Sequence, residues 1–106
     1  MPKYLIKATY TTEGARGLLK EGGTGRRAAV QKLMENVGGK VEAFYYAYGE
    51  ADAIVIVDVP DATSVLALSL AVNTSGAVHL STTPLITPEE MDTATKKSLQ
   101  YRAPGA

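Results

Sequence analysis

His79 is the only histidine in this 106-residue chain, and imidazole is the side chain that exchanges a proton most readily near neutral pH. It alternates with apolar neighbours in a strand-like segment, so it is expected to share one face with Ser81. Lys7 and Thr9 interrupt another apolar segment and can lie beside them. This grouping predicts a general base or a set of ligand-binding groups. The alternative is a lone histidine at an interface or a strand edge.

Tyrosine is the second residue type that could take part in chemistry, because a phenol combines an apolar ring with a hydrogen-bonding tip. Tyr46 and Tyr48 are two residues apart in a strand-like segment and are expected to share a face. Beside His79 they could orient an aromatic or quinone-like substrate, which makes His79 and Tyr46 candidate catalytic residues. The candidate ligand-binding residues are Lys7, Thr9, Tyr48 and Ser81. Packing is the alternative role for most of the six tyrosines.

A glycine-rich segment, Gly22 to Gly25, is followed directly by Arg26 and Arg27. Flexible backbone, a helix N-terminus and two cations together resemble an anion site. No Lys-Ser/Thr pair follows, and a helix rather than a strand precedes, so the segment matches neither a P-loop nor a dinucleotide fingerprint. The alternative is a helix break with two solvated arginines.

Composition excludes several classes of function. The chain has no cysteine, which removes disulfides, thiolate nucleophiles and cysteine-ligated metals. With one histidine, a multi-histidine metal site is excluded as well, and we expect no metal and no cofactor. Lys+Arg and Asp+Glu number 11 each, so no basic field exists for nucleic acid or an anionic membrane. No apolar stretch approaches 18 residues and no secretion signal is recognisable, so we expect a cytoplasmic protein.

The residues that could do chemistry must be positioned by eight predicted elements. In chain order these are a strand over 4–10, helices over 15–20 and 26–37, strands over 40–48 and 53–59, a helix over 62–73, a strand over 77–83 and a helix over 88–99. The order is that of an α+β, ferredoxin-like β-α-β-β-α-β fold: a four-stranded antiparallel sheet with both main helices on one face, plus a C-terminal helix. We expect residues 1–100 to form a single domain and 101–106 a flexible tail.

The uncovered face of the predicted sheet favours self-association. The segment Ala53–Val57 is apolar on both faces, and the preceding strand is aromatic on both. Helices on one side would leave an apolar patch, which a second copy could bury as a homodimer or higher homo-oligomer. The alternative is a central strand that faces a pocket. The helix around 65–72 is apolar nearly all round, and either the C-terminal helix or a subunit contact could cover it.

Several segments resemble the GYD-domain family of small bacterial proteins: Pro2 to Leu5, Gly17 to Gly23, Gly38 to Tyr45, Gly49 with Asp52, and Thr87 to Glu90. The resemblance covers about Met1 to Lys97. It implies a ferredoxin-like fold related to dimeric α+β barrel proteins, which include cofactor-free monooxygenases and small-molecule-binding domains. One departure concerns the tyrosine that usually precedes the motif's acid, because Ala51 stands there.

Three functional hypotheses follow. The first is a homo-oligomeric protein that binds a small molecule at the open face of the sheet. The second is a cofactor-free monooxygenase-like or isomerase-like enzyme with His79 as its base. The third is a structural assembly module. In each case the expected macromolecular partner is a second copy of the chain, not nucleic acid or a membrane.

Overall fold

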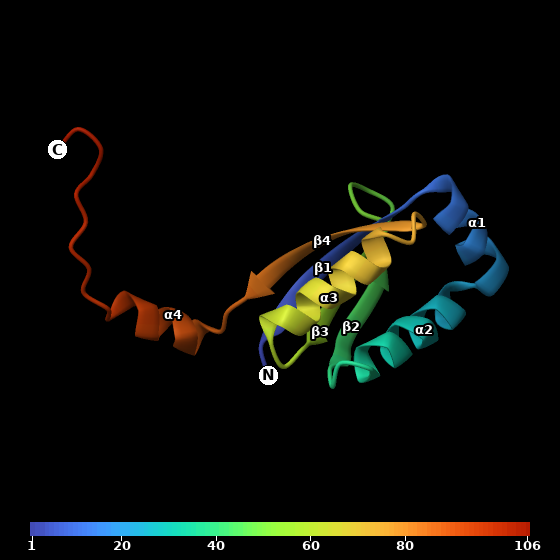
Figure 1. Cartoon of the computed structure of the whole chain (residues 1–106), viewed down its shortest axis with the longest axis horizontal. Helices are drawn as coiled ribbons and strands as arrows, with labels where there is room; N and C mark the ends of the chain where they lie inside the picture. The colour runs from blue at the N-terminus through green and yellow to red at the C-terminus, as the bar shows by residue number, and fades with distance from the viewer.

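The computed structural model describes all 106 residues, and its centre is a four-stranded antiparallel sheet (Figure 1). The strands β1 (Lys3–Tyr10), β2 (Lys40–Tyr46), β3 (Ala53–Asp58) and β4 (Val78–Leu85) lie in the order β2-β3-β1-β4. β3 pairs antiparallel with both β1 and β2, so these two strands run the same way with β3 between them. This split βαβ arrangement confirms the predicted ferredoxin-like fold class.

The helices are α1 (Thr12–Glu21), α2 (Gly23–Glu35), α3 (Ala62–Asn73) and α4 (Pro88–Thr95). α2 packs against β2 and α3 against β4, and both lie on the same face of the sheet (Figure 1). None of the four helices has the length and apolar character needed to cross a membrane. The core between helices and sheet consists of Tyr4, Ile6, Met34, Val55, Val57, Val59, Val65 and Leu68.

α1 is longer than the predicted helix over 15–20, and the predicted break over 22–25 is a single residue, because Gly23 and Gly25 belong to α2. At Gly14, a Cβ atom would lie 1.9 Å from the carbonyl oxygen of Ala77, so glycine lets α1 approach the chain just before β4. Gly17 has no neighbour within 4 Å of such an atom. The break falls at Gly22, whose φ of 81° favours glycine, and α2 begins at the next residue.

The opposite face of the sheet carries no helix. Strand register places Leu5, Lys7 and Thr9 on this open face, together with residues of β3 and β4. Among these are Ile54 and Ile56 of β3 and His79 and Ser81 of β4. The sheet therefore has one covered and one open face within the chain, as its sequence predicts.

The C-terminal segment leaves the body of the molecule after β4 (Figure 1). Every residue from 86 to 106 is exposed, and α4 ends at Thr95 rather than at the predicted position 99. The Cα radius of gyration is 17.0 Å, whereas a compact domain of this length has about 13 Å. α4 therefore does not cover α3, where Leu66 and Leu70 are each 58% exposed.

Candidate functional site

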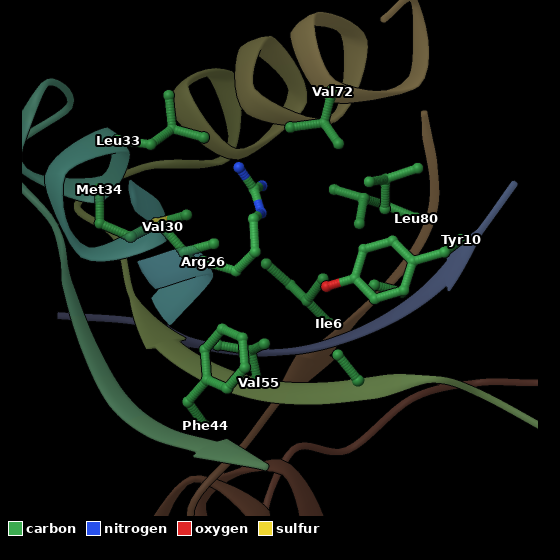
Figure 2. Close-up of a pocket in the computed structure, with 13 residues that line it drawn as sticks. Ile6, Tyr10, Arg26, Val30, Leu33, Met34, Phe44, Val55, Val72 and Leu80 are labelled. Atoms are coloured by element: carbon green, nitrogen blue, oxygen red, sulfur yellow. The ribbon is translucent and has the colours of Figure 1, made fainter. Parts of the chain in front are cut away.

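An apolar cavity lies between α2, α3 and the helix-covered face of the sheet (Figure 2). Its volume is about 70 Å³, and 12 of its 13 lining residues are hydrophobic. The one charged lining residue is Arg26. The sheet contributes, among others, Ile6, Val55 and Leu80, and the helices contribute Val30, Leu33 and Val72.

The helical repeat explains why a cation joins this apolar lining. Arg26, Val30 and Leu33 are four and then three residues apart on α2, so they lie on one face of the helix. That face points at the cavity, and the Arg26 side chain extends across it towards α3 in Figure 2. The Arg26 side chain is 31% exposed, and its nearest carboxylate oxygen, on Glu21, is 3.8 Å away.

Tyr10 brings a hydroxyl to the same cavity, and Figure 2 shows the phenol directed towards the Arg26 side chain. The loop between β2 and β3 holds this residue in place. The backbone N–H of Tyr10 donates to the Asp52 carboxylate at 2.8 Å, and the backbone N–H of Asp52 donates to the carbonyl oxygen of Ala8, also at 2.8 Å. The Asp52 carboxylate thus accepts a backbone hydrogen bond from the end of β1 rather than from its own turn.

A wider hollow of about 380 Å³ adjoins the cavity. It shares five lining residues with it: Tyr10, Arg26, Leu33, Val72 and Val78. Glu13 and Glu21 line the hollow as well, so it is more polar and more acidic than the cavity. Together the two spaces form one groove that runs from the interior to the surface beside α1.

Tyr46 forms a hydrogen bond to the first residue of α2. Its hydroxyl donates to the carbonyl oxygen of Gly23 at 2.9 Å, and its ring meets Phe44 edge-on with centroids 5.1 Å apart. Burial is the main reason that the pKa of the Tyr46 phenol is raised above the ordinary 10.0, and nearby Tyr10 adds to the shift. The phenol therefore keeps its proton and acts as a hydrogen-bond donor.

The structure brings together four of the six residues expected at a site. Lys7 pairs with Ser81 and Thr9 with His79 across β1 and β4, which confirms their common face. These four residues line a shallow hollow of about 260 Å³ on the open face, and the remaining two lining residues are Glu50 and Ala51. All four side chains are exposed in the single chain, so their role as a binding site stays a prediction.

Tyr46 and Tyr48 do not join that group. A register irregularity between Val41 and Ala43 inserts one residue into β2, which turns every later side chain to the opposite face. Tyr46 consequently faces the helices, opposite the buried Ala53, and is separated from His79 by the sheet. Tyr48 follows the end of β2 and is fully exposed. The arrangement that a His79-based enzyme would need is therefore not formed within one chain.

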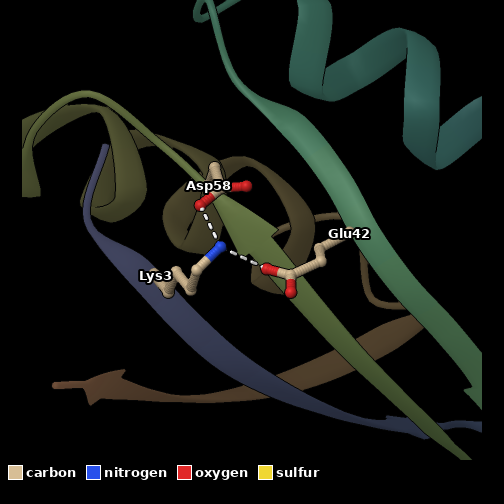
Figure 3. Close-up of polar contacts among 3 residues, drawn as sticks. All are labelled: Lys3, Glu42 and Asp58. Atoms are coloured by element: carbon tan, nitrogen blue, oxygen red, sulfur yellow. Dashed lines mark hydrogen bonds and ion pairs between the residues drawn. The ribbon is translucent and has the colours of Figure 1, made fainter. Parts of the chain in front are cut away.

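A polar cluster at the other end of the open face escaped prediction altogether (Figure 3). Lys3 of β1 bridges the carboxylates of Asp58 on β3 and Glu42 on β2, with a distance of 2.9 Å to Asp58. Hydrogen bonds to Glu42 and then to Asp58 raise the pKa of Lys3 above its ordinary 10.5. Asp58 is only 4% exposed, so the ammonium group neutralises a buried charge. His, Asp and Glu side chains nowhere form a group of three that could hold a metal ion.

The sequence also did not predict that Arg26 and Tyr10 line the same cavity. The spacing of Arg26 from Val30 and Leu33 is visible in the sequence and could have indicated a cation on the apolar face of α2. Tyr10 gives no such signal, because its contact with α2 depends on the tertiary fold.

Comparison with curated proteins and with solved structures gives no match. The family model described as the GYD domain matches residues 4–95, which include all four helices and all four strands except Lys3, the first residue of β1. The chain belongs to the GYD domain family.

Proposed function

We propose that this protein binds a small, largely apolar molecule in the cavity between α2, α3 and the sheet. The observation that carries the proposal is the lining itself, in which 12 of 13 residues are hydrophobic and a single cation and one phenol converge. Concave, mostly apolar sites with a few placed polar groups are the usual form of small-molecule sites.

The dimensions fit an occupant that is only partly enclosed. The cavity of about 70 Å³ is too small for most metabolites, but the adjoining hollow adds about 380 Å³. Small-molecule sites typically measure about 300–1,000 Å³. An apolar end would fill the cavity, and the rest of the molecule would lie between α1 and α3.

A cavity-filling variant tests this proposal. The probe is the neutral fluorophore N-phenyl-1-naphthylamine, whose emission rises in apolar surroundings. Val30→Phe places a ring in the cavity and is expected to weaken probe binding at least about tenfold. Leu66→Phe is the matched control, because Leu66 is 58% exposed and lines neither space. Absence of binding to the wild type, or equal binding to Val30→Phe, would contradict the proposal.

A second function, self-association through the open face, is supported by the area that the chain exposes. The accessible surface is 7580 Å² for a mass of 11.2 kDa, whereas a folded monomer of that mass exposes about 5,700 Å². The excess is larger than the roughly 800 Å² that each partner buries in a standard interface. Leu5, Ile54 and Ile56 supply apolar contacts on this face.

In such a dimer the open-face hollow would lie between the two sheets, where Lys7, Thr9, His79 and Ser81 could bind a second, more polar ligand. Light scattering coupled to size exclusion tests the assembly. The expected mass is at least twice the 11.2 kDa of one chain. A monomer at micromolar concentration would rule out this second function and leave the cavity proposal intact.

A further inference from the structure

We propose that the occupant of the cavity is an apolar organic acid with one negative charge, whose carboxylate binds the Arg26 guanidinium and the Tyr10 hydroxyl. This inference rests on the function proposed above and names the chemical class of the ligand. It combines three observations: the unsatisfied donors of Arg26, the direction of the Tyr10 phenol, and the acidic rim of the outer hollow.

The Arg26 side chain lacks a hydrogen-bond partner within the chain. A guanidinium carries five N–H donors in a planar fork and stays charged at all physiological pH values. The nearest carboxylate, on Glu21, forms an ion pair with Arg26 at 3.8 Å, which is beyond hydrogen-bond distance and leaves the guanidinium donors free. A partly buried cation among hydrophobic side chains is stabilised by an anion that takes up these donors.

Tyr10 provides a second donor from the opposite side of the cavity. In Figure 2 its hydroxyl lies on the side of the ring that is nearer Arg26, whose guanidinium extends towards α3. The Asp52 carboxylate accepts the backbone N–H of Tyr10, and the Asp52 backbone N–H donates to Ala8, so these two bonds hold the end of β1 and hence the phenol in place. A carboxylate has two oxygens, so one can accept from the guanidinium and the other from the phenol.

The outer hollow limits the charge that the ligand can carry. Glu13 and Glu21 line it, and like charges repel at short range where water is partly excluded. A second carboxylate, or a phosphate with two charges, would meet these side chains. The site therefore favours an apolar ligand with a single negative charge for two reasons: Arg26 attracts the first charge, and Glu13 and Glu21 repel a second one.

The test compares 1-naphthoate with its neutral isostere 1-naphthamide by isothermal titration calorimetry. We expect the wild type to bind the acid about tenfold or more tightly than the amide, because hydrogen bonds to charged groups are the stronger ones. Arg26→Gln should remove this preference and leave amide binding unchanged. Arg27→Gln is the matched control and should behave as the wild type, because Arg27 lies outside both spaces.

Arg26→Lys keeps the positive charge but loses the planar guanidinium with its paired donors. We therefore expect a preference for the acid between those of the wild type and Arg26→Gln. Equal binding of acid and amide by the wild type, or an unchanged preference in Arg26→Gln, would overturn the inference and leave the proposed function standing. Failure of both compounds to displace bound N-phenyl-1-naphthylamine would overturn the inference alone, whereas absence of probe binding to the wild type would overturn the proposed function as well.

Discussion

Arg26 and Arg27 are adjacent in the sequence, yet their side chains line two different spaces. Successive residues of a helix point about 100° apart, so Arg26 faces the cavity while Arg27 lines a separate hollow beside Tyr46. The two side chains therefore do not line one common space at the start of α2. The difference also makes Arg27 a useful control for any variant of Arg26.

The raised pKa of Lys3 predicts how the stability of the fold depends on pH. Its pKa is raised in the folded state, so the ion cluster stabilises the fold fully below pH 10.5 and loses this contribution as pH rises past the folded pKa. We expect Lys3→Gln to lower the free energy of unfolding at pH 7, because the buried Asp58 carboxylate loses its partner. Denaturant titrations at pH 7 and pH 11 check the change.

The difference between wild type and Lys3→Gln should shrink at pH 11. Lys7→Gln is the control, since Lys7 lies on the same strand face but has no ion pair. A gap between Lys3→Gln and wild type that stays constant across this pH range would show that the charge on Lys3 is not what stabilises the cluster.

Side-chain caps fix where the helices α3 and α4 begin. Thr87 and Glu90 form a reciprocal capping box, with both backbone-to-side-chain bonds at 3.0 Å, and Pro88 begins α4 as its sequence predicts. The Asp61 carboxylate accepts the backbone N–H of Ser64 at 2.8 Å and thereby caps α3. This bond is the main reason that the pKa of Asp61 is lowered from 3.8.

Two glycines of α1 provide a matched pair of substitutions. Gly17→Ala should stabilise the fold by about 0.5–1 kcal/mol, because alanine is the better helix former and meets no neighbour. Gly14→Ala should destabilise it by about 1–3 kcal/mol, because the added Cβ would press on the backbone of Ala77 and overpack the contact. Thermal and urea unfolding of both variants measure the difference. Equal effects of the two substitutions would refute the close approach of α1 to Ala77.

At the scale of the whole molecule, the chain has more surface than its own fold can bury. The C-terminal segment carries Met91, Leu99 and Tyr101, which are 50%, 84% and 78% exposed. Ile54 and Ile56 on the open face are only partly buried, and Leu66 and Leu70 of α3 are each 58% exposed. These surfaces are what a second copy could shield.

A chain that ends at Ile86 tests the role of the C-terminal segment. It should keep its fold and its cavity, because residues 86–106 are all exposed and none of them lines the cavity. We expect its self-association to weaken at least about tenfold, since the apolar side chains of the segment would lose their contacts with the partner. Circular dichroism checks the fold and analytical ultracentrifugation the assembly. Association equal to that of the full chain would exclude the segment from the interface.

Local patterns in the sequence determined the elements, their order and the ferredoxin-like topology. Alternation in β1 and β4 was enough to place Lys7, Thr9, His79 and Ser81 on one face, because a strand has a strict period of two. These features depend on residues close in the chain, which is why they could be predicted.

Which other side chains join each face of the sheet, and which of them meet across it, depends on long-range packing. The bulge in β2 moved Tyr46 to the helix side, and no local pattern marks a bulge in a strand that is apolar on both faces. The bridge of Lys3 to Asp58 joins residues 55 positions apart. The cavity arises because α2 and α3 approach the sheet without closing over it, and that gap depends on packing among distant side chains rather than on local preference.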